Sequence, residues 1–138
     1  KEIDADGVHL GQDDLDIKSA REYLGADKII GVSAHNVKEA LEAENGGADY
    51  LGSGAAFVTS TKTDAGAIDH KVLSDVAHSV KIPVVAIGGI NKDNISQLEG
   101  LGLDGVAVVS AIFAADDISS AVIDLKAKAE KVAESSVK

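Results

Sequence analysis

The sequence predicts an α/β fold, and within that class it favours a (β/α)8 barrel. Short apolar stretches alternate with longer amphipathic ones along the 138 residues, which is the pattern of repeated βα units. Glycine and polar residues gather directly after the apolar stretches, and in a barrel these loops share the face that carries the chemistry. A phrase with an Asp at its second position recurs at 5–8, 48–51 and 103–106. A doubly wound open sheet is the alternative arrangement of the same units.

Five stretches are expected to be strands because they are short and rich in Val, Ile and Leu. They lack a strict alternation of apolar and polar residues, which is typical of parallel strands buried on both faces. The Asp of the recurring phrase leads into three of them, and we expect it to accept hydrogen bonds from backbone N–H groups next along the chain. The strands are Gly7–Leu10, Ile29–Ser33, Tyr50–Gly54, Val84–Gly88 and Val106–Ser110.

Five amphipathic stretches are expected to be helices. Acidic residues open the first, Asn36 and Asn91 are suited to cap the second and fourth, and Pro83 follows the third. They are Asp14–Leu24, Asn36–Asn45, Asp69–Val80, Asn91–Leu101 and Ile118–Val132. Because a barrel has eight strands and usually at least ~200 residues, we expect residues 1–138 to be one domain that supplies about the last five βα units.

Composition excludes several classes of function. The formal net charge of -10 argues against non-specific binding to nucleic acid or anionic membranes, since both require a basic surface. The chain has no cysteine, so disulfides, thiolate metal sites and thiol catalysis are excluded. No apolar run approaches the ~20 residues of a membrane span. We expect a cytoplasmic protein without nucleic-acid or membrane partners.

The last two strands of the prediction end in a candidate phosphate site. Gly88-Gly89-Ile90-Asn91 follows one strand and opens a predicted helix. Glycine lets a ligand approach the backbone closely, and a helix N-terminus offers free N–H groups to an anion. Val109 and Ser110 follow the last strand and can add donors. If the chain ends a barrel, these are strands seven and eight, where phosphates frequently bind; the alternative is a tight turn that needs glycine for geometry only.

The longest loop adds a second group of donors. Thr59, Ser60, Thr61 and Lys62 place three hydroxyls and an ammonium in four consecutive residues. Such a set can cradle a phosphate oxyanion, although loops of this composition are often simply solvated. Its position beside the glycine loops favours a role in binding.

Polar residues also follow the first two predicted strands. Asp13 and Asp14 could provide a carboxylate for Mg²⁺, which shares its other positions with phosphate and water, but spacing alone favours an acidic helix start. Ser33 could donate to a phosphate or act as a helix cap. His35 is expected to be non-catalytic, and His9, inside an apolar strand, is expected to be a core residue with its hydrogen bonds satisfied.

The chain resembles the thiamine phosphate synthases through five motifs that occur in the same order over nearly its whole length. They are ADGVHLGQDD at 5–14, GVSAH at 31–35, TSTK at 59–62, VAIGGI at 85–90 and GVAVVSAI at 105–112. The resemblance implies a (β/α)8 barrel and an Mg²⁺-dependent transferase. Such an enzyme joins 4-amino-5-hydroxymethyl-2-methylpyrimidine diphosphate to 4-methyl-5-(β-hydroxyethyl)thiazole phosphate, and releases thiamine phosphate and pyrophosphate.

The resemblance also implies roles for individual residues. Asp14 would bind Mg²⁺, and no residue would act as a nucleophile or base. Eight residues would contact the substrates: Ser33 and Lys62 at the pyrimidine diphosphate, and Thr59, Ser60, Thr61, Gly89, Val109 and Ser110 at the thiazole phosphate. A protein with this role neutralises the leaving group and aligns the reactants.

Two departures from the family pattern bear on activity. Ala55 and Val58 stand where the family usually has prolines. The Gln-x-Arg-x-x-x-Lys motif and the Asn-Asp pair of the family's first three strands are absent, so we expect the chain alone to be inactive and a second segment or chain to complete the barrel. The alternatives are a thiazole tautomerase, which has a His where Ala55 stands, and a non-catalytic domain that binds a phosphorylated ligand.

Overall fold

The strands form one parallel sheet in which neighbours in sequence are neighbours in space. The computed structural model describes residues 1–58 and 66–136. Its sheet runs in the order β1-β2-β3-β4-β5. A doubly wound sheet reverses its strand order near the middle, whereas this order does not reverse, which is consistent with consecutive βα units of a barrel. The strands are β1 (Gly7–Leu10), β2 (Ile29–Ala34), β3 (Tyr50–Ser53), β4 (Val84–Ile87) and β5 (Gly105–Ala107).

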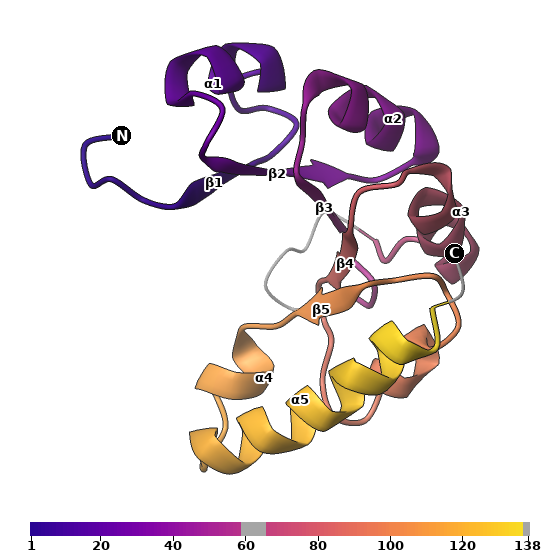
Figure 1. Cartoon of the computed structure of the whole chain (residues 1–138). Coiled ribbons are helices and arrows are strands. Elements are labelled where there is room, and N and C mark those ends of the chain that lie inside the picture. Colours follow the sequence, from indigo (N-terminus) through magenta and orange to yellow (C-terminus); the bar gives the residue numbers. More distant parts are fainter. Residues whose placement is uncertain (59–65, 137–138) are drawn as a thin grey trace.

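The helices connect the strands and cover one side of the sheet. Figure 1 shows α1, α2 and α3 following one another along the same side of the curved sheet. This arrangement is expected, because right-handed crossovers between adjacent parallel strands place each connecting helix on the same face. The helices are α1 (Ile17–Leu24), α2 (Val37–Gly46), α3 (His70–Ser79), the 3-10 helix η1 (Ile95–Leu98), α4 (Ser110–Phe113) and α5 (Ile118–Glu134).

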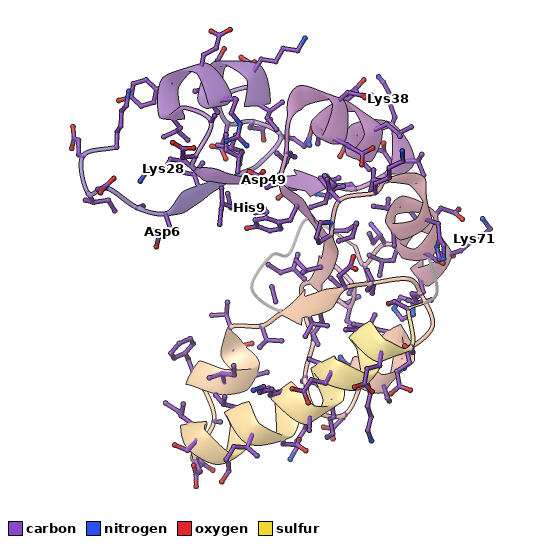
Figure 2. All side chains as sticks on the ribbon, viewed as in Figure 1. Asp6, His9, Lys28, Lys38, Asp49 and Lys71 are labelled. Atoms are coloured by element: carbon purple, nitrogen blue, oxygen red, sulfur yellow. The ribbon has the colours of Figure 1, made fainter. Side chains whose placement is uncertain are left out.

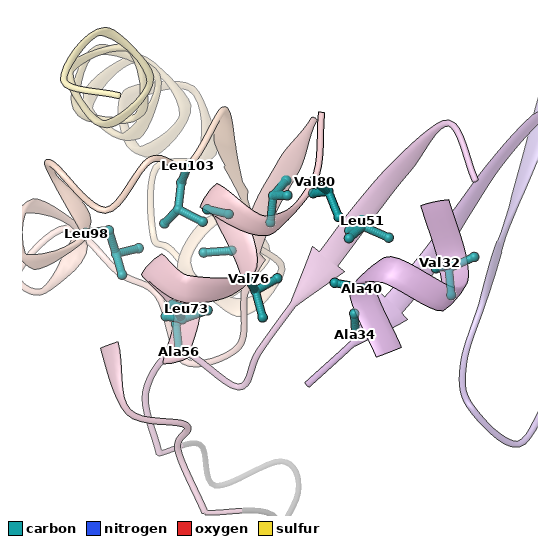
Figure 3. Packing of buried hydrophobic residues seen from close by; sticks show 14 of the residues in the cluster. Val32, Ala34, Ala40, Leu51, Ala56, Leu73, Val76, Val80, Leu98 and Leu103 are labelled. Carbon is teal, nitrogen blue, oxygen red and sulfur yellow. The ribbon is translucent and has the colours of Figure 1, made fainter. Parts of the chain in front are cut away.

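The hydrophobic core lies between these helices and one face of the sheet. Alternate strand residues such as Val32, Leu51 and Val84 are buried there, and they pack against small and branched side chains of α2 and α3 (Figure 3). On the opposite face Ile29 and Ile87 are 51% and 43% exposed. The expectation that the strands are buried on both faces is therefore wrong for the described residues, because all crossover helices pack on one side.

The aspartates of the recurring phrase connect neighbouring strands. Asp49 donates its N–H to the carbonyl of Ile30 at 2.8 Å and accepts the Ile30 N–H at its carboxylate at 2.7 Å. Asp104 does the same with Val84, at 2.8 Å for both hydrogen bonds. The prediction that these carboxylates bind N–H groups next along the chain is wrong. They bind the preceding strand, about 20 residues earlier.

Most element boundaries agree with the prediction, and three differ for local reasons. Strand β5 ends at Ala107 rather than Ser110, because Ser110 begins α4. Helix α1 begins at Ile17 rather than Asp14, because the Asp16 side chain caps it and accepts the Ser19 N–H at 3.1 Å. The helix predicted over 91–101 is reduced to η1. There the Asn91 side chain accepts the Asp93 N–H at 2.9 Å, which holds the backbone in a turn instead of a helix.

Candidate functional site

The predicted site residues that the structure describes lie along one edge of the sheet. Parallel register places Leu10 beside Val32, and Ile87 beside Ala107. Because the carboxyl ends of parallel strands meet at the same edge, the loops that follow them lie next to one another. Residues 88–91 and 108–110 therefore emerge side by side after β4 and β5.

The loop after β4 is built by close backbone contacts. Gly88 and Gly89 have φ values of 99° and 65°, which favour glycine. Phe57, in the loop after β3, donates its N–H to the Gly88 carbonyl at 3.0 Å. A Cβ atom on Gly89 would lie 2.7 Å from the Phe57 carbonyl oxygen. Residues 55–57 after β3 and residues 88–89 after β4 thus lie in close contact.

The predicted helix N-terminus at Asn91 is not present. The Asn94 side chain accepts the Asn91 N–H at 2.8 Å and donates to the Gly89 carbonyl at 2.9 Å. The Asn91 N–H, which the sequence predicts to be free for an anion, is therefore already hydrogen-bonded. The helix that directly follows a strand is α4, which begins at Ser110 and places Val109, 67% exposed, at its entrance. Of the predicted donors, Thr59, Ser60, Thr61 and Lys62 lie outside the described residues.

Asp14 and Ser33 lie at the ends of β1 and β2. The Asp14 carboxylate accepts the Gly11 N–H at 2.6 Å, which fixes the turn after β1. Gln12 donates from its side chain to the Ser33 carbonyl at 2.6 Å. Asn36, and not Ser33, caps α2, so the helix-cap alternative for Ser33 is wrong.

The Ser33 hydroxyl belongs to a network with His9 and Tyr50. The His9 ring lies 3.0 Å from the Ser33 hydroxyl through Nε2 and 2.9 Å from the Tyr50 hydroxyl through Nδ1. The ring crosses over Gly31, where a Cβ atom would lie 2.5 Å from Nδ1. Figure 2 shows His9 extending from the side of β1 that faces away from α1 and α2. These groups present polar atoms on the open face of the sheet.

The prediction that His9 is a core residue is wrong, although its hydrogen bonds are satisfied. Its side chain is exposed at the open face. Strands β2 and β3 still surround the ring closely enough for desolvation to lower the pKa of His9, and the negative charge of Asp14 opposes that shift. A neutral imidazole can donate to one hydroxyl and accept from the other. His35 instead pairs with Glu39, at 3.0 Å between Nδ1 and the carboxylate.

The sequence model of the family described as thiamine monophosphate synthase matches residues 1–112. The chain belongs to this family. It is 56% identical over 116 residues to the thiamine-phosphate synthase of Clostridium acetobutylicum, covering 84% of this chain and 55% of that protein. It is 51% identical over 124 residues to the Clostridium beijerinckii thiamine-phosphate synthase, covering 90% of this chain and 59% of that protein.

A solved structure supports the same assignment. The thiamine phosphate pyrophosphorylase from Pyrococcus furiosus superimposes with a TM-score of 0.84 at 48% identity. The match covers 94% of this chain and 62% of that protein. The chain therefore spans about three fifths of the length of the relatives it matches. The superposition indicates that the chain and the Pyrococcus furiosus protein share a fold over the matched part.

Tyr50 and Gln12 join the candidate site of this thiamine monophosphate synthase family member, and sequence reasoning missed both. A usable signal was present in the glycines within strands. Gly31 and Gly52 leave space over β2 and β3, and the His9 ring fills it, with a Cβ on Gly52 lying 3.0 Å from the ring. Glycine inside a strand marks a close approach of another group.

Asp14 is compatible with a role as a magnesium ligand. Mg²⁺ is commonly bound by one or two carboxylates together with substrate phosphates. One oxygen of Asp14 is oriented by Gly11, and a carboxylate held in this way can present its other oxygen to a cation. Within the described ranges, no three His, Asp or Glu side chains form a metal-binding group.

The structure also bears on membrane association. Among the described residues, no helix combines the length and apolar character needed to cross a membrane.

Proposed function

We propose that this chain carries the last five βα units of a (β/α)8-barrel thiamine phosphate synthase that acts in the cytoplasm. The family match over residues 1–112 is the observation that supports it most strongly. The strand order and one-sided helix layer support a segment of barrel wall. The substrates are the pyrimidine diphosphate and the thiazole phosphate implied by the family resemblance.

The end of β1 and β2 would bind the pyrimidine diphosphate. In this proposal Asp14 holds Mg²⁺, and Ser33 and Lys62 contact the diphosphate. The orientation of Asp14 by Gly11 and of Ser33 by His9 supports these roles. Bound Mg²⁺ would neutralise charge on the diphosphate.

The ends of β4 and β5 would bind the thiazole phosphate. Gly89, Val109 and Ser110 would contact it through backbone and hydroxyl donors, and Thr59, Ser60 and Thr61 would line the same site. The side-by-side exit of the loops after β4 and β5 supports this assignment. Because the Asn91 amide is occupied by Asn94, the proposal relies on α4 and the glycine loop for its donors.

The reaction needs no protein nucleophile. The carbon–oxygen bond between the pyrimidine methylene and the diphosphate breaks, and pyrophosphate leaves with the bonding electrons. The thiazole nitrogen then forms a bond with the methylene carbon, which gives thiamine phosphate. Two anionic groups held at opposite ends of the strand edge would position the reactants in line.

The test is formation of thiamine phosphate from the two substrates with Mg²⁺. The chain is assayed alone and together with the separately produced part of the Clostridium acetobutylicum relative that it does not match. We expect no product from the chain alone, and product from the reconstituted barrel. Ser33→Ala should lower that activity at least tenfold, whereas Ser96→Ala, an exposed serine on η1, should leave it unchanged.

Other outcomes would redirect the proposal. Thiazole phosphate isomerisation without coupling would indicate a tautomerase. Binding of thiazole phosphate without any turnover by the reconstituted barrel would indicate a non-catalytic binding domain. Full activity of the 138-residue chain alone would contradict the requirement for a completing segment.

A further inference from the structure

The aspartates before β3 and β5 form a repeated clamp between strands. Each aspartate forms two hydrogen bonds with one residue of the preceding strand. Its N–H donates to the carbonyl of that residue, and its carboxylate accepts the N–H of that residue. The bonded residue lies directly opposite in register, since Tyr50 pairs with Gly31 and Gly105 pairs with Val85. In both cases the carboxylate takes the place of a backbone carbonyl and extends the ladder by one bond.

Asp6 occupies the same position before β1. It precedes Gly7 as Asp49 precedes Tyr50. Its carbonyl accepts the Ile29 N–H of the following strand at 3.0 Å, so its backbone is oriented as the first rung of the β1–β2 ladder. By analogy with Asp49 and Asp104, whose N–H and carboxylate bind the preceding strand, we expect the N–H and carboxylate of Asp6 to serve the other side of β1.

That other side of β1 is a free sheet edge. Among the described residues β1 pairs with β2 alone, and no N–H or other donor is bound to the Asp6 carboxylate, which is exposed. Figure 2 shows Asp6 at the outer margin of β1, apart from Asp49, which lies beside β2 and α1. A strand edge with unpaired N–H and C=O groups is a template for another strand.

We propose that Asp6 forms the same pair of hydrogen bonds with a parallel strand that is added to the free edge of β1. Its carboxylate accepts the N–H, and its own N–H donates to the C=O, of the one residue that faces it in register. The residue so bonded must have an N–H and therefore is not proline. The occupant is a segment of the barrel that this chain does not span, since the chain covers 55% to 62% of its relatives. The inference rests on the part of the proposed function that has a further segment complete the barrel. It makes no use of substrates.

The two existing clamps argue for this occupant over a second copy of the chain. Both connect strands that run parallel, with the Asp on the strand that comes later in the chain. Two copies meeting through their β1 edges about a two-fold axis would pair antiparallel. An incoming strand that precedes β1 in the barrel reproduces the direction and order of the observed clamps.

The test measures binding of the 138-residue chain to the part of the Clostridium acetobutylicum relative that it does not match, by isothermal titration calorimetry. Loss of the carboxylate would leave one N–H of the added strand unpaired, so Asp6→Ala should weaken binding about tenfold. Asp6→Asn, which keeps one oxygen acceptor, should weaken it less. Asp75→Ala, which removes an exposed acid on α3, is the control and should bind as the unaltered chain does.

Amide hydrogen exchange supplies a second readout. In the complex one amide of the added segment should exchange slowly with the unaltered chain and quickly with Asp6→Ala. The same substitution should leave the circular dichroism of the isolated chain unchanged, because Asp6 is exposed there.

Three results would overturn the inference: absence of a complex, equal affinity of Asp6→Ala and Asp75→Ala, or a self-associated dimer that Asp6→Ala dissociates. A complex that depends on Asp6 and yet forms no thiamine phosphate would refute the proposed function while leaving the clamp intact. A complex that forms thiamine phosphate but binds equally well with Asp6→Ala would refute the clamp and leave the proposed function intact.

Discussion

Gly89 holds the loop after β4 in a conformation that side-chain-bearing residues rarely adopt. Its φ is 65°, and a Cβ would approach the Phe57 carbonyl oxygen to 2.7 Å. We expect Gly89→Ala to lower the free energy of unfolding by about 1–3 kcal/mol. In the reconstituted barrel it should also weaken binding of the thiazole phosphate, because the loops after β3 and β4 must move apart. Urea unfolding and calorimetry measure the two effects.

Gly100→Ala is the matched control for this substitution. Gly100 also has a positive φ, 77°, but no atom lies within 4 Å of the position that a Cβ would take there. Gly100→Ala therefore places a side chain at an unfavourable positive φ, but it creates no close contact with a neighbouring backbone. Equal losses of stability in the two variants, or unchanged thiazole phosphate affinity in Gly89→Ala, would argue against a tight contact at Gly89.

His9 should make stability depend on pH through its hydroxyl contacts. Desolvation lowers the pKa of His9 in the folded chain below its usual value of 6.5. The unfolded chain then binds more protons between the two values, so stability rises with pH across that window. The contribution of neutral His9 is complete above pH 6.5 and is lost as the pH falls through the folded value.

Urea unfolding of the unaltered chain and of His9→Gln, repeated from pH 8 down to pH 5, measures this contribution. The difference in free energy of unfolding between the two proteins should shrink as the pH falls. Parallel curves would mean that His9 has the same pKa in the folded and unfolded chains.

At the scale of secondary-structure elements, the clamp at Asp49 should stabilise the pairing of β2 and β3. The Ile30 N–H is the largest influence that lowers the pKa of Asp49, and Arg21 adds to it through a 2.7 Å ion pair. Because the side chain is half exposed, we expect Asp49→Ala to cost about 1 kcal/mol. Asp49→Asn should cost less, since it keeps an acceptor for Ile30. Urea unfolding at pH 7 provides the measurement.

A double-mutant cycle with Arg21→Ala separates the two partners of Asp49. If the clamp itself stabilises the sheet, Asp49→Ala should remain destabilising in a chain that already lacks the Arg21 side chain. A neutral effect in that background would assign the whole contribution to the ion pair.

The elements that the sequence predicted well are those whose local pattern and tertiary packing agree. Asn36 caps α2 as expected, because a side-chain acceptor at that position satisfies free helix N–H groups. Asp69 caps α3 at the residue where that helix was predicted to begin. The helix predicted over 91–101 failed for a different reason. Ile95 and Leu98 are buried as its apolar spacing requires, but Asn91 and Asn94 hold the preceding amides in a turn.

The candidate site was predictable in its position at the strand ends and not in its composition. Gly89, Val109 and Ser110 were predicted because they follow apolar strands in loops that contain glycine and hydroxyl residues, and their contact with a ligand stays a prediction. His9 was misplaced because a short strand does not reveal which face is covered by helices. The partnership of His9 with Tyr50 depends on a register between strands 41 residues apart, which no local pattern encodes.

At the scale of the whole molecule, the sheet formed by the described residues is covered on one face and open at two edges. Its open face carries His9 and Tyr50 together with the exposed side chains of Ile29 and Ile87. In a closed barrel inward-facing side chains of all strands fill the interior. This face therefore combines polar and apolar groups, and the proposed barrel would enclose it.

This asymmetry predicts a gradient of amide hydrogen exchange across the sheet. Strand β3 pairs on both sides, whereas β1 and β5 each pair on one side within the described residues. In the isolated chain β3 should exchange most slowly, and β1 and β5 faster, since unpaired edge amides are open to solvent. Addition of the completing segment should slow β1 and β5 and leave β3 nearly unchanged. Peptide-resolved mass spectrometry measures this, with sedimentation of the isolated chain as the control. Exchange of β1 as slow as that of β3 in a monomeric chain would show that the edge is already covered.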